Sequence, residues 1–129
     1  MNSTSTVASL PVSDVAAAKA FYTDKVGLTV AYEIDEAGVV NFGEGATQLG
    51  IYVSYTGGKA PGTFTQVTFV VPDVPASVSE LQSKGVTFEE YDMPQLKTDN
   101  GVATNPDGSK AAWFRDPDGN MLALVQEPS

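Results

Sequence analysis

The 129-residue sequence contains no cysteine and no histidine. Without cysteine there is no disulfide, no thiolate nucleophile and no sulfur-ligated zinc or iron–sulfur site. Without histidine there is no imidazole ligand for a metal, and no serine or cysteine nucleophile activated by imidazole. The two absences exclude most common metal centres and the common nucleophilic hydrolases.

Basic residues are also scarce: seven Lys and Arg stand against 16 Asp and Glu, which gives a formal net charge of −9. This charge repels phosphate backbones and anionic lipid surfaces, so we expect neither nucleic acid nor a membrane as a partner. The acidity either attracts a cationic ligand or only keeps the protein in solution.

Long hydrophobic runs are missing too. Residues 1–14 have neither a basic segment nor a long apolar one, and no later run is long enough to span a bilayer. We therefore expect a cytoplasmic protein. Hydrophobic residues make up 42% and charged residues 18% of the chain, which is typical of one compact globular domain covering residues 1–129.

The clearest local pattern is a hairpin near the end of the chain. Two apolar runs, residues 111–115 and 121–126, flank Asp116-Pro117-Asp118-Gly119-Asn120, whose residues favour a tight turn. If Asp116 pairs with Asn120, Trp113 lies opposite Ala123 on the same face of the sheet. A register change of one residue would put Phe114 there instead.

The rest of the chain divides into similar halves. Residues 12–29 match residues 71–87 in the order of their caps, apolar positions and glycines, which indicates an internal repeat. In each half we expect a strand, a capped helix that ends at a glycine, and further strands. The first half should contain a strand at 7–10 ended by Pro11, a helix from Ser13 or Asp14 to Gly27, and strands at 28–34, 39–42 and 49–54. The second should contain a strand at 64–71, a helix from Asp73 to Gly85, a strand at 86–90 and the hairpin.

Two modules of βαβββ order follow, at about residues 7–56 and 63–127, joined by a linker at 57–62. Residues 91–110 form a polar connection longer than most loops in compact domains. Such a connection is either a functional lid or contains a further short strand, for which residues 101–103 are the candidate.

These repeats, the Phe21-Tyr22 pair followed by Lys25-Val26-Gly27, and the Asp116–Asn120 turn together resemble the vicinal oxygen chelate superfamily. It includes glyoxalase I, bleomycin-resistance proteins and extradiol dioxygenases. The resemblance implies an α+β fold in which two βαβββ modules form a cupped, barrel-like mixed sheet around one cavity. It also implies a homodimer.

The resemblance implies four metal-ligand positions, which in the family's enzymes hold inward-facing residues, usually His, Glu or Gln. Here they fall on Val7, on residues 50–52, on Gln66 and on Ala123. One amide oxygen cannot hold a divalent cation against water. We therefore expect no metal, no other cofactor and no catalytic residue of the family's kind. In character the chain is nearest to the metal-free bleomycin-resistance-like members.

Six residues are candidates for contact with a small molecule. Phe42, Tyr52, Gln66 and Trp113 are expected to line the cavity, with Tyr91 and Met93 from the long connection as a lid. Phe42 and Tyr52 also fit an ordinary strand core, and Gln66 can equally satisfy neighbouring backbone groups.

Three functions compete. The first is a binding module for a small, cationic or aromatic molecule, which needs none of the missing residues. The second is a lyase, isomerase or dioxygenase-type enzyme of the same superfamily, working without the usual metal or with one not recognised here; without a metal, Glu44, Glu89 or Asp92 would be the general base. The third is a dimerising scaffold whose cup is filled by its own side chains.

Overall fold

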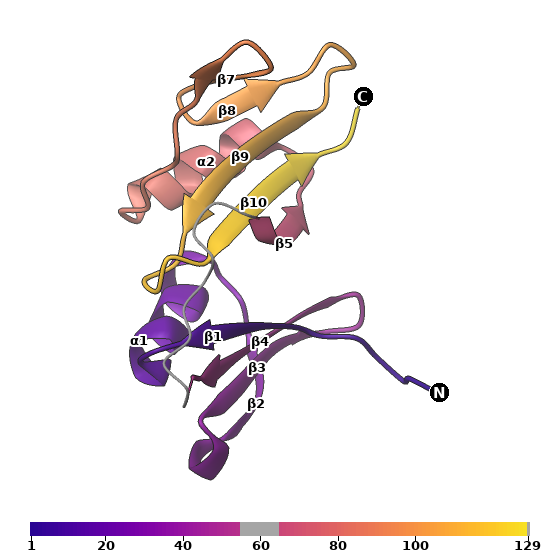
Figure 1. Cartoon of the computed structure of the whole chain (residues 1–129), viewed down its shortest axis with the longest axis vertical. Helices are drawn as coiled ribbons and strands as arrows, with labels where there is room; N and C mark the ends of the chain where they lie inside the picture. The colour runs from indigo at the N-terminus through magenta and orange to yellow at the C-terminus, as the bar shows by residue number, and fades with distance from the viewer. Residues whose placement is uncertain (55–64, 129) are drawn as a thin grey trace. The chain divides into compact units, whose positions relative to one another are not determined.

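The computed structural model describes residues 1–54 and 65–128 (Figure 1). Contacts divide the chain into two units: Met1–Pro61 with Asp116–Asn120, and Gly62–Arg115 with Met121–Ser129. The linker expected at residues 57–62 and the strand start expected at Phe64 lie outside the described residues. Among the described residues no helix is long and apolar enough to cross a membrane.

The first unit has one four-stranded sheet in the order β1-β4-β3-β2, in which β1 runs parallel to β4 and the other pairs are antiparallel. Its elements follow the expected βαβββ order. They are β1 (Ala8–Val12), α1 (Val15–Ala20), the π-helix η1 (Phe21–Lys25), β2 (Val30–Ile34), the 3-10 helix η2 (Asp35–Ala37), β3 (Val39–Glu44) and β4 (Thr47–Val53).

The second unit repeats this topology, with β5 parallel to β10, and extends it to a six-stranded sheet in the order β5-β10-β9-β8-β7-β6. The α+β class and the two βαβββ modules are therefore confirmed. The elements are β5 (Thr65–Val70), α2 (Val74–Ser83), β6 (Asp92–Met93), β7 (Leu96–Asp99), β8 (Val102–Thr104), β9 (Lys110–Arg115) and β10 (Met121–Gln126).

Both helices begin where the sequence predicted. The side chains of Asp14 and Asp73 accept hydrogen bonds from the backbone N–H groups of Ala17 and Ala76, at 3.1 and 3.0 Å. Each carboxylate satisfies an amide that has no partner within the first helical turn. The first helix differs in its second half, where the backbone changes to π-helix at Phe21–Lys25.

Two expectations about strands were wrong. Pro11 does not end β1 but lies within it, opposite Tyr52. β1 is an edge strand of its sheet, where proline needs no N–H on the outer side. Residues 86–90 do not form a strand; only Phe88 makes a β-bridge, to Phe114. The short strand expected at residues 101–103 is present as β8.

In each unit the helix covers one face of the sheet. Strand alternation directs every second side chain to that face. The buried residues there are, in the first unit, Leu10, Val12, Val40, Phe42, Leu49 and Ile51 with Ala18 and Tyr22 from the helices, and in the second, Ala112, Phe114, Leu122 and Leu124 with Val74, Val78 and Leu81 from α2. We call the opposite face of each sheet its helix-free face.

The first unit contains a buried polar network around Asp116. Oδ2 of this carboxylate accepts hydrogen bonds from the Tyr22 hydroxyl and the Asn120 side-chain amide, both at 2.7 Å. Oδ1 accepts from the backbone N–H groups of Asp118 and Asn120, at 2.9 and 2.8 Å. Asn120 also donates to the carbonyl of Pro11 at 3.0 Å. The turn between β9 and β10 is thereby fixed within the first unit.

Removal of the Tyr22 hydroxyl tests this network. Tyr22→Phe leaves the buried carboxylate one donor short, and we expect the free energy of unfolding to fall by about 1.5–3 kcal/mol, as for a hydrogen bond to a charged group. The measurement is urea denaturation at neutral pH. Tyr32→Phe is the matched control, because Tyr32 is 54% exposed, and it should change stability little. Equal effects of the two variants would contradict the role of the network.

Alkaline pH provides a second test. Burial, and then the charge and hydrogen bond of Asp116, raise the pKa of Tyr22 well above its ordinary value. The folded state therefore holds the phenol proton more tightly than the unfolded state, whose tyrosines titrate near pH ~10. The stability due to Tyr22 is present below that pH and is lost progressively as the pH rises above it. Urea midpoints from about pH 8 to about pH 11.5 should fall more steeply for the wild type than for Tyr22→Phe; parallel curves would contradict this.

Candidate functional site

The candidate site is the helix-free face of the six-stranded sheet, around Trp113. The expected register is confirmed: Asp116 donates its backbone N–H to the Asn120 carbonyl at 3.0 Å, and Trp113 lies opposite Ala123. Phe114, the alternative, lies opposite Leu122 on the helix-covered face and is fully buried against Phe88, with ring centroids 5.2 Å apart. Of the two aromatic residues, only Trp113 belongs to the helix-free face.

Trp113 is half-buried and has an aromatic neighbour. The ring of Tyr91 meets it edge to face, with centroids 5.6 Å apart and planes at 85°. Such geometry aligns the positive edge of one ring with the negative face of the other. In the described part of the chain the indole N–H of Trp113 has no hydrogen-bond partner. The pair thus presents an aromatic surface with one donor that no described residue satisfies.

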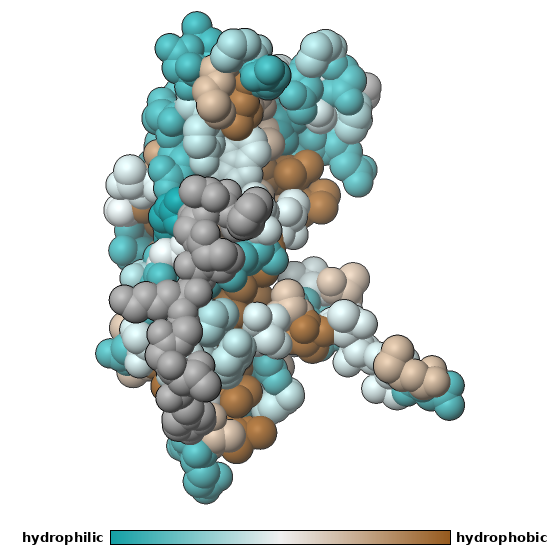
Figure 2. Space-filling view, in the orientation of Figure 1, coloured by the Kyte–Doolittle hydropathy of each residue, from teal (hydrophilic) through white to brown (hydrophobic). Residues whose placement is uncertain are grey.

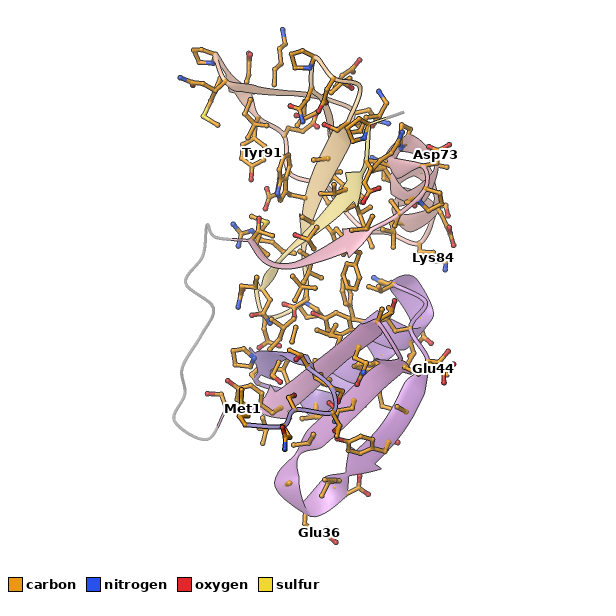
Figure 3. The ribbon with its side chains drawn as sticks, turned by 90° about the vertical axis from the view of Figure 1, so that its right-hand side faces the viewer. Met1, Glu36, Glu44, Asp73, Lys84 and Tyr91 are labelled. Atoms are coloured by element: carbon orange, nitrogen blue, oxygen red, sulfur yellow. The ribbon has the colours of Figure 1, made fainter. Side chains whose placement is uncertain are left out.

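Tyr91 is held by the hairpin that follows it (Figure 3). Its backbone N–H donates to the Thr98 hydroxyl at 2.8 Å, and its carbonyl accepts from the Thr98 N–H at 2.9 Å. Met93 lies in β6, opposite Leu96, and is 48% exposed. The long connection therefore contains three strands, β6, β7 and β8, at the edge of the sheet, and Tyr91 and Met93 belong to that edge.

Next to Trp113 along β9 lies an ion pair. Nε of Arg115 is 2.6 Å from the Glu89 carboxylate, and both side chains are about one third exposed. The Glu89 N–H donates to the Trp113 carbonyl at 2.8 Å, which joins this segment to β9. Because Glu89 is paired with Arg115, it is a poor candidate for the general base suggested by the sequence. The other two acids of that hypothesis, Glu44 and Asp92, are exposed.

Gln66 is used by the backbone. β5 has a bulge beside the start of β10, and Oε1 of Gln66 accepts the Met121 N–H there at 3.2 Å. The side chain thus satisfies an amide that the bulge removes from the ladder. This is the structural role that the sequence left open.

The residues at the four positions where the resemblance places metal ligands do not fit a metal. Val7 and Ala123 have no side-chain donor atom, residues 50–52 offer only the Tyr52 hydroxyl, and the Gln66 oxygen accepts the Met121 N–H. Gly50 lies opposite Ser9 and Asn41, and a Cβ added to it would be 2.5 Å from the Asn41 side-chain oxygen. A carboxylate at position 50 would have to displace Asn41. Divalent cations need several oxygen or nitrogen ligands, which these side chains do not provide.

Phe42 and Tyr52, predicted as lining residues, lie on opposite faces of the first unit's sheet. Phe42 is 1% exposed and packs against Tyr22 on the helix-covered face, with ring centroids 5.7 Å apart. Tyr52 is on the helix-free face, 40% exposed, between Val39 and Pro11 on the neighbouring strands. Val40 and Phe42 alternate with Asn41 and Gly43, and this alternation is the sequence signal that favours the core for Phe42.

Exposed hydrophobic residues occur on both units, as brown atoms in Figure 2 show. The largest of them among the described residues, apart from Met1, are Tyr32, Ile34, Tyr52, Val70 and Met93. The sequence did not indicate that the Tyr22 hydroxyl donates to Asp116 or that Asn120 donates to the Pro11 carbonyl, because these hydrogen bonds join residues far apart in the chain.

Comparison with known proteins agrees with this architecture. The family model described as the Glyoxalase/Bleomycin resistance protein/Dioxygenase superfamily matches residues 4–124. No match was found among curated proteins.

Solved structures resemble the chain over nearly its whole length. One is a member of the glyoxalase/bleomycin resistance protein/dioxygenase superfamily from Sphaerobacter thermophilus DSM 20745, with 26% identity, a TM-score of 0.70 and 94% of each chain covered. TnmS3, an antibiotic binding protein from Streptomyces sp. CB03234, has 25% identity, a TM-score of 0.66 and coverage of 99% of this chain and 98% of its own.

Lactoylglutathione lyase from Agrobacterium tumefaciens is 20% identical, with a TM-score of 0.70 and coverage of 98% of this chain and 96% of its own, which shows a shared fold. The repeated βαβββ topology and the family match over residues 4–124 lead to one conclusion: the chain belongs to the Glyoxalase/Bleomycin resistance protein/Dioxygenase superfamily.

Proposed function

We propose that the chain binds a small aromatic molecule on the helix-free face of its six-stranded sheet, without a divalent metal. The observation that carries the proposal is the half-buried Trp113, whose indole N–H has no partner among residues 1–54 and 65–128 and whose ring meets Tyr91 edge to face. A ligand ring can stack on these side chains, and a ligand acceptor can take the N–H. Small-molecule sites combine apolar surface with a few oriented polar groups in this way.

The superfamily by itself does not choose between binding and catalysis. Among similar structures, TnmS3 is an antibiotic binding protein and the Agrobacterium tumefaciens protein is a lyase. The residues at the four ligand positions support binding rather than metal-dependent catalysis. Val7 and Ala123 offer no metal ligand and residues 50–52 offer only the Tyr52 hydroxyl, so the chemistry that a metal would supply to a bound carbonyl or oxygen has little support from these residues. Binding requires none of it.

Net charge favours one kind of aromatic ligand. With a formal charge of −9 the protein attracts cations from solution and repels anions. Because Arg115 is paired with Glu89, the two side chains together add no net charge beside Trp113. We therefore propose a cationic aromatic molecule, as the sequence suggested.

Fluorescence of the single tryptophan measures this binding directly. We expect the planar cation proflavine to quench Trp113 with saturation, and anilinonaphthalene sulfonate, an anion, to bind more weakly. Tyr91→Ala should weaken proflavine binding about five- to tenfold, since an aromatic contact contributes about 1 kcal/mol or slightly more. Tyr32→Ala, which removes an exposed tyrosine from the first unit, is the control and should leave the affinity unchanged. Identical affinities of the Tyr91→Ala variant and the wild type would exclude this face.

Metal content is the second test. Elemental analysis of the purified protein should find no stoichiometric divalent metal, and EDTA should leave proflavine quenching unchanged, because the four positions lack a donor set. One metal per chain that survives dialysis, together with loss of quenching in EDTA, would overturn the metal-free proposal and revive the enzyme hypothesis.

A further inference from the structure

A concave site lies within the first unit, at the start of β2. It is a pocket of about 570 Å³, lined by residues 27–31 and by Gly43, Glu44 and Thr47 from the β3–β4 hairpin. This volume is in the range of sites that hold small organic molecules, about 300–1,000 Å³. All of its lining residues belong to one unit, so the pocket is complete within it.

Local backbone geometry forms the pocket. The register between β2 and β3 shifts between Val30 and Tyr32, which removes Ala31 from the regular ladder. Across from it, the Gly43 N–H donates to the Thr29 carbonyl at 2.8 Å and fixes the hairpin against the start of β2. Gly43 has a φ of +79°, and a Cβ there would lie 1.9 Å from the Thr47 carbonyl oxygen, so only glycine fits.

The polar side chains that line the pocket carry one carboxylate and two hydroxyl groups. Glu44 is the only charged lining residue, and Thr29 and Thr47 add hydroxyl groups. In the described part of the chain none of these three side chains has a hydrogen-bond or ion-pair partner. The described residues of the first unit contain two lysines, one of which pairs with Glu33, against eight acidic residues. The electrostatic potential at the pocket therefore favours a cation.

We propose that this pocket binds a small organic ammonium ion, with the ammonium at the Glu44 carboxylate and its N–H groups donating to the hydroxyl oxygens of Thr29 or Thr47. The short alkyl part of the ligand lies along Leu28, Val30 and Ala31. This site is separate from the Trp113 face and does not depend on the function proposed for it.

The test is a titration of the full chain with n-butylammonium chloride. NMR signals of the backbone amides report the binding. Gly27, Gly43 and Gly45 report on the pocket and its hairpin, and we expect their signals to shift with saturation. n-Butanol, which has the same alkyl group and no charge, should shift them much less. Tetramethylammonium, which has the charge but no N–H donors, should bind more weakly than n-butylammonium.

Two variants separate the pocket from the general acidity of the surface. Glu44→Gln should weaken n-butylammonium binding about two- to fivefold, the effect of losing one exposed ion pair. Glu36→Gln is the matched control: Glu36 is exposed in the same unit, in η2 before β3, whereas Glu44 is at the far end of β3 (Figure 3). It should bind like the wild type. Ala31→Leu, which fills the pocket without removing charge, should abolish the shifts.

Equal weakening in Glu44→Gln and Glu36→Gln would show attraction to the whole acidic surface and would overturn the proposal. Glycine signals that do not move with n-butylammonium would overturn it as well. Trp113 fluorescence should stay constant in the titration, so that failure of this site and failure of the aromatic site are observed separately.

Discussion

The buried carboxylate of Asp116 accepts four hydrogen bonds, two of them from the backbone of its own turn and two from the side chains of Tyr22 and Asn120. These bonds fix where β9 ends and β10 begins. In a hairpin, a shift of one residue moves every side chain to the other face of the sheet. The turn therefore determines that Trp113 lies on the helix-free face and that Phe114 lies in the core. The candidate site on β9 depends on a carboxylate that does not itself belong to it.

Much of the architecture follows from local sequence. The caps at Asp14 and Asp73 and the glycines after each helix were predictable because each forms a contact with residues close to it in the chain. The β6–β7 hairpin was not predicted as strands, since its sequence has no apolar alternation and its pairing depends on the neighbouring β8. Pro11 was misjudged for a related reason: proline is excluded from central strands, and the sequence does not tell which strand is at an edge.

The candidate site was predictable in part. Trp113 and Tyr91 were both identified, but their contact with each other was not, because it joins two segments through Thr98 and the hairpin. Phe42 was both a candidate for ligand contact and a candidate for the strand core, and its 1% exposure places it in the core. Gln66 illustrates the same limit: only the bulge in β5 shows that its oxygen serves the backbone.

The residues of the turn, Asp116–Asn120, belong by their contacts to the first unit, although the strands on both sides belong to the second. The two modules are repeats of one topology, yet the first is completed by five residues from the far end of the chain. A first module made without the second would leave Tyr22 without its carboxylate partner and the Pro11 carbonyl without the Asn120 amide. The repeat in topology is therefore not a repeat in self-sufficiency, because the first module takes part of its buried polar network from the hairpin of the second.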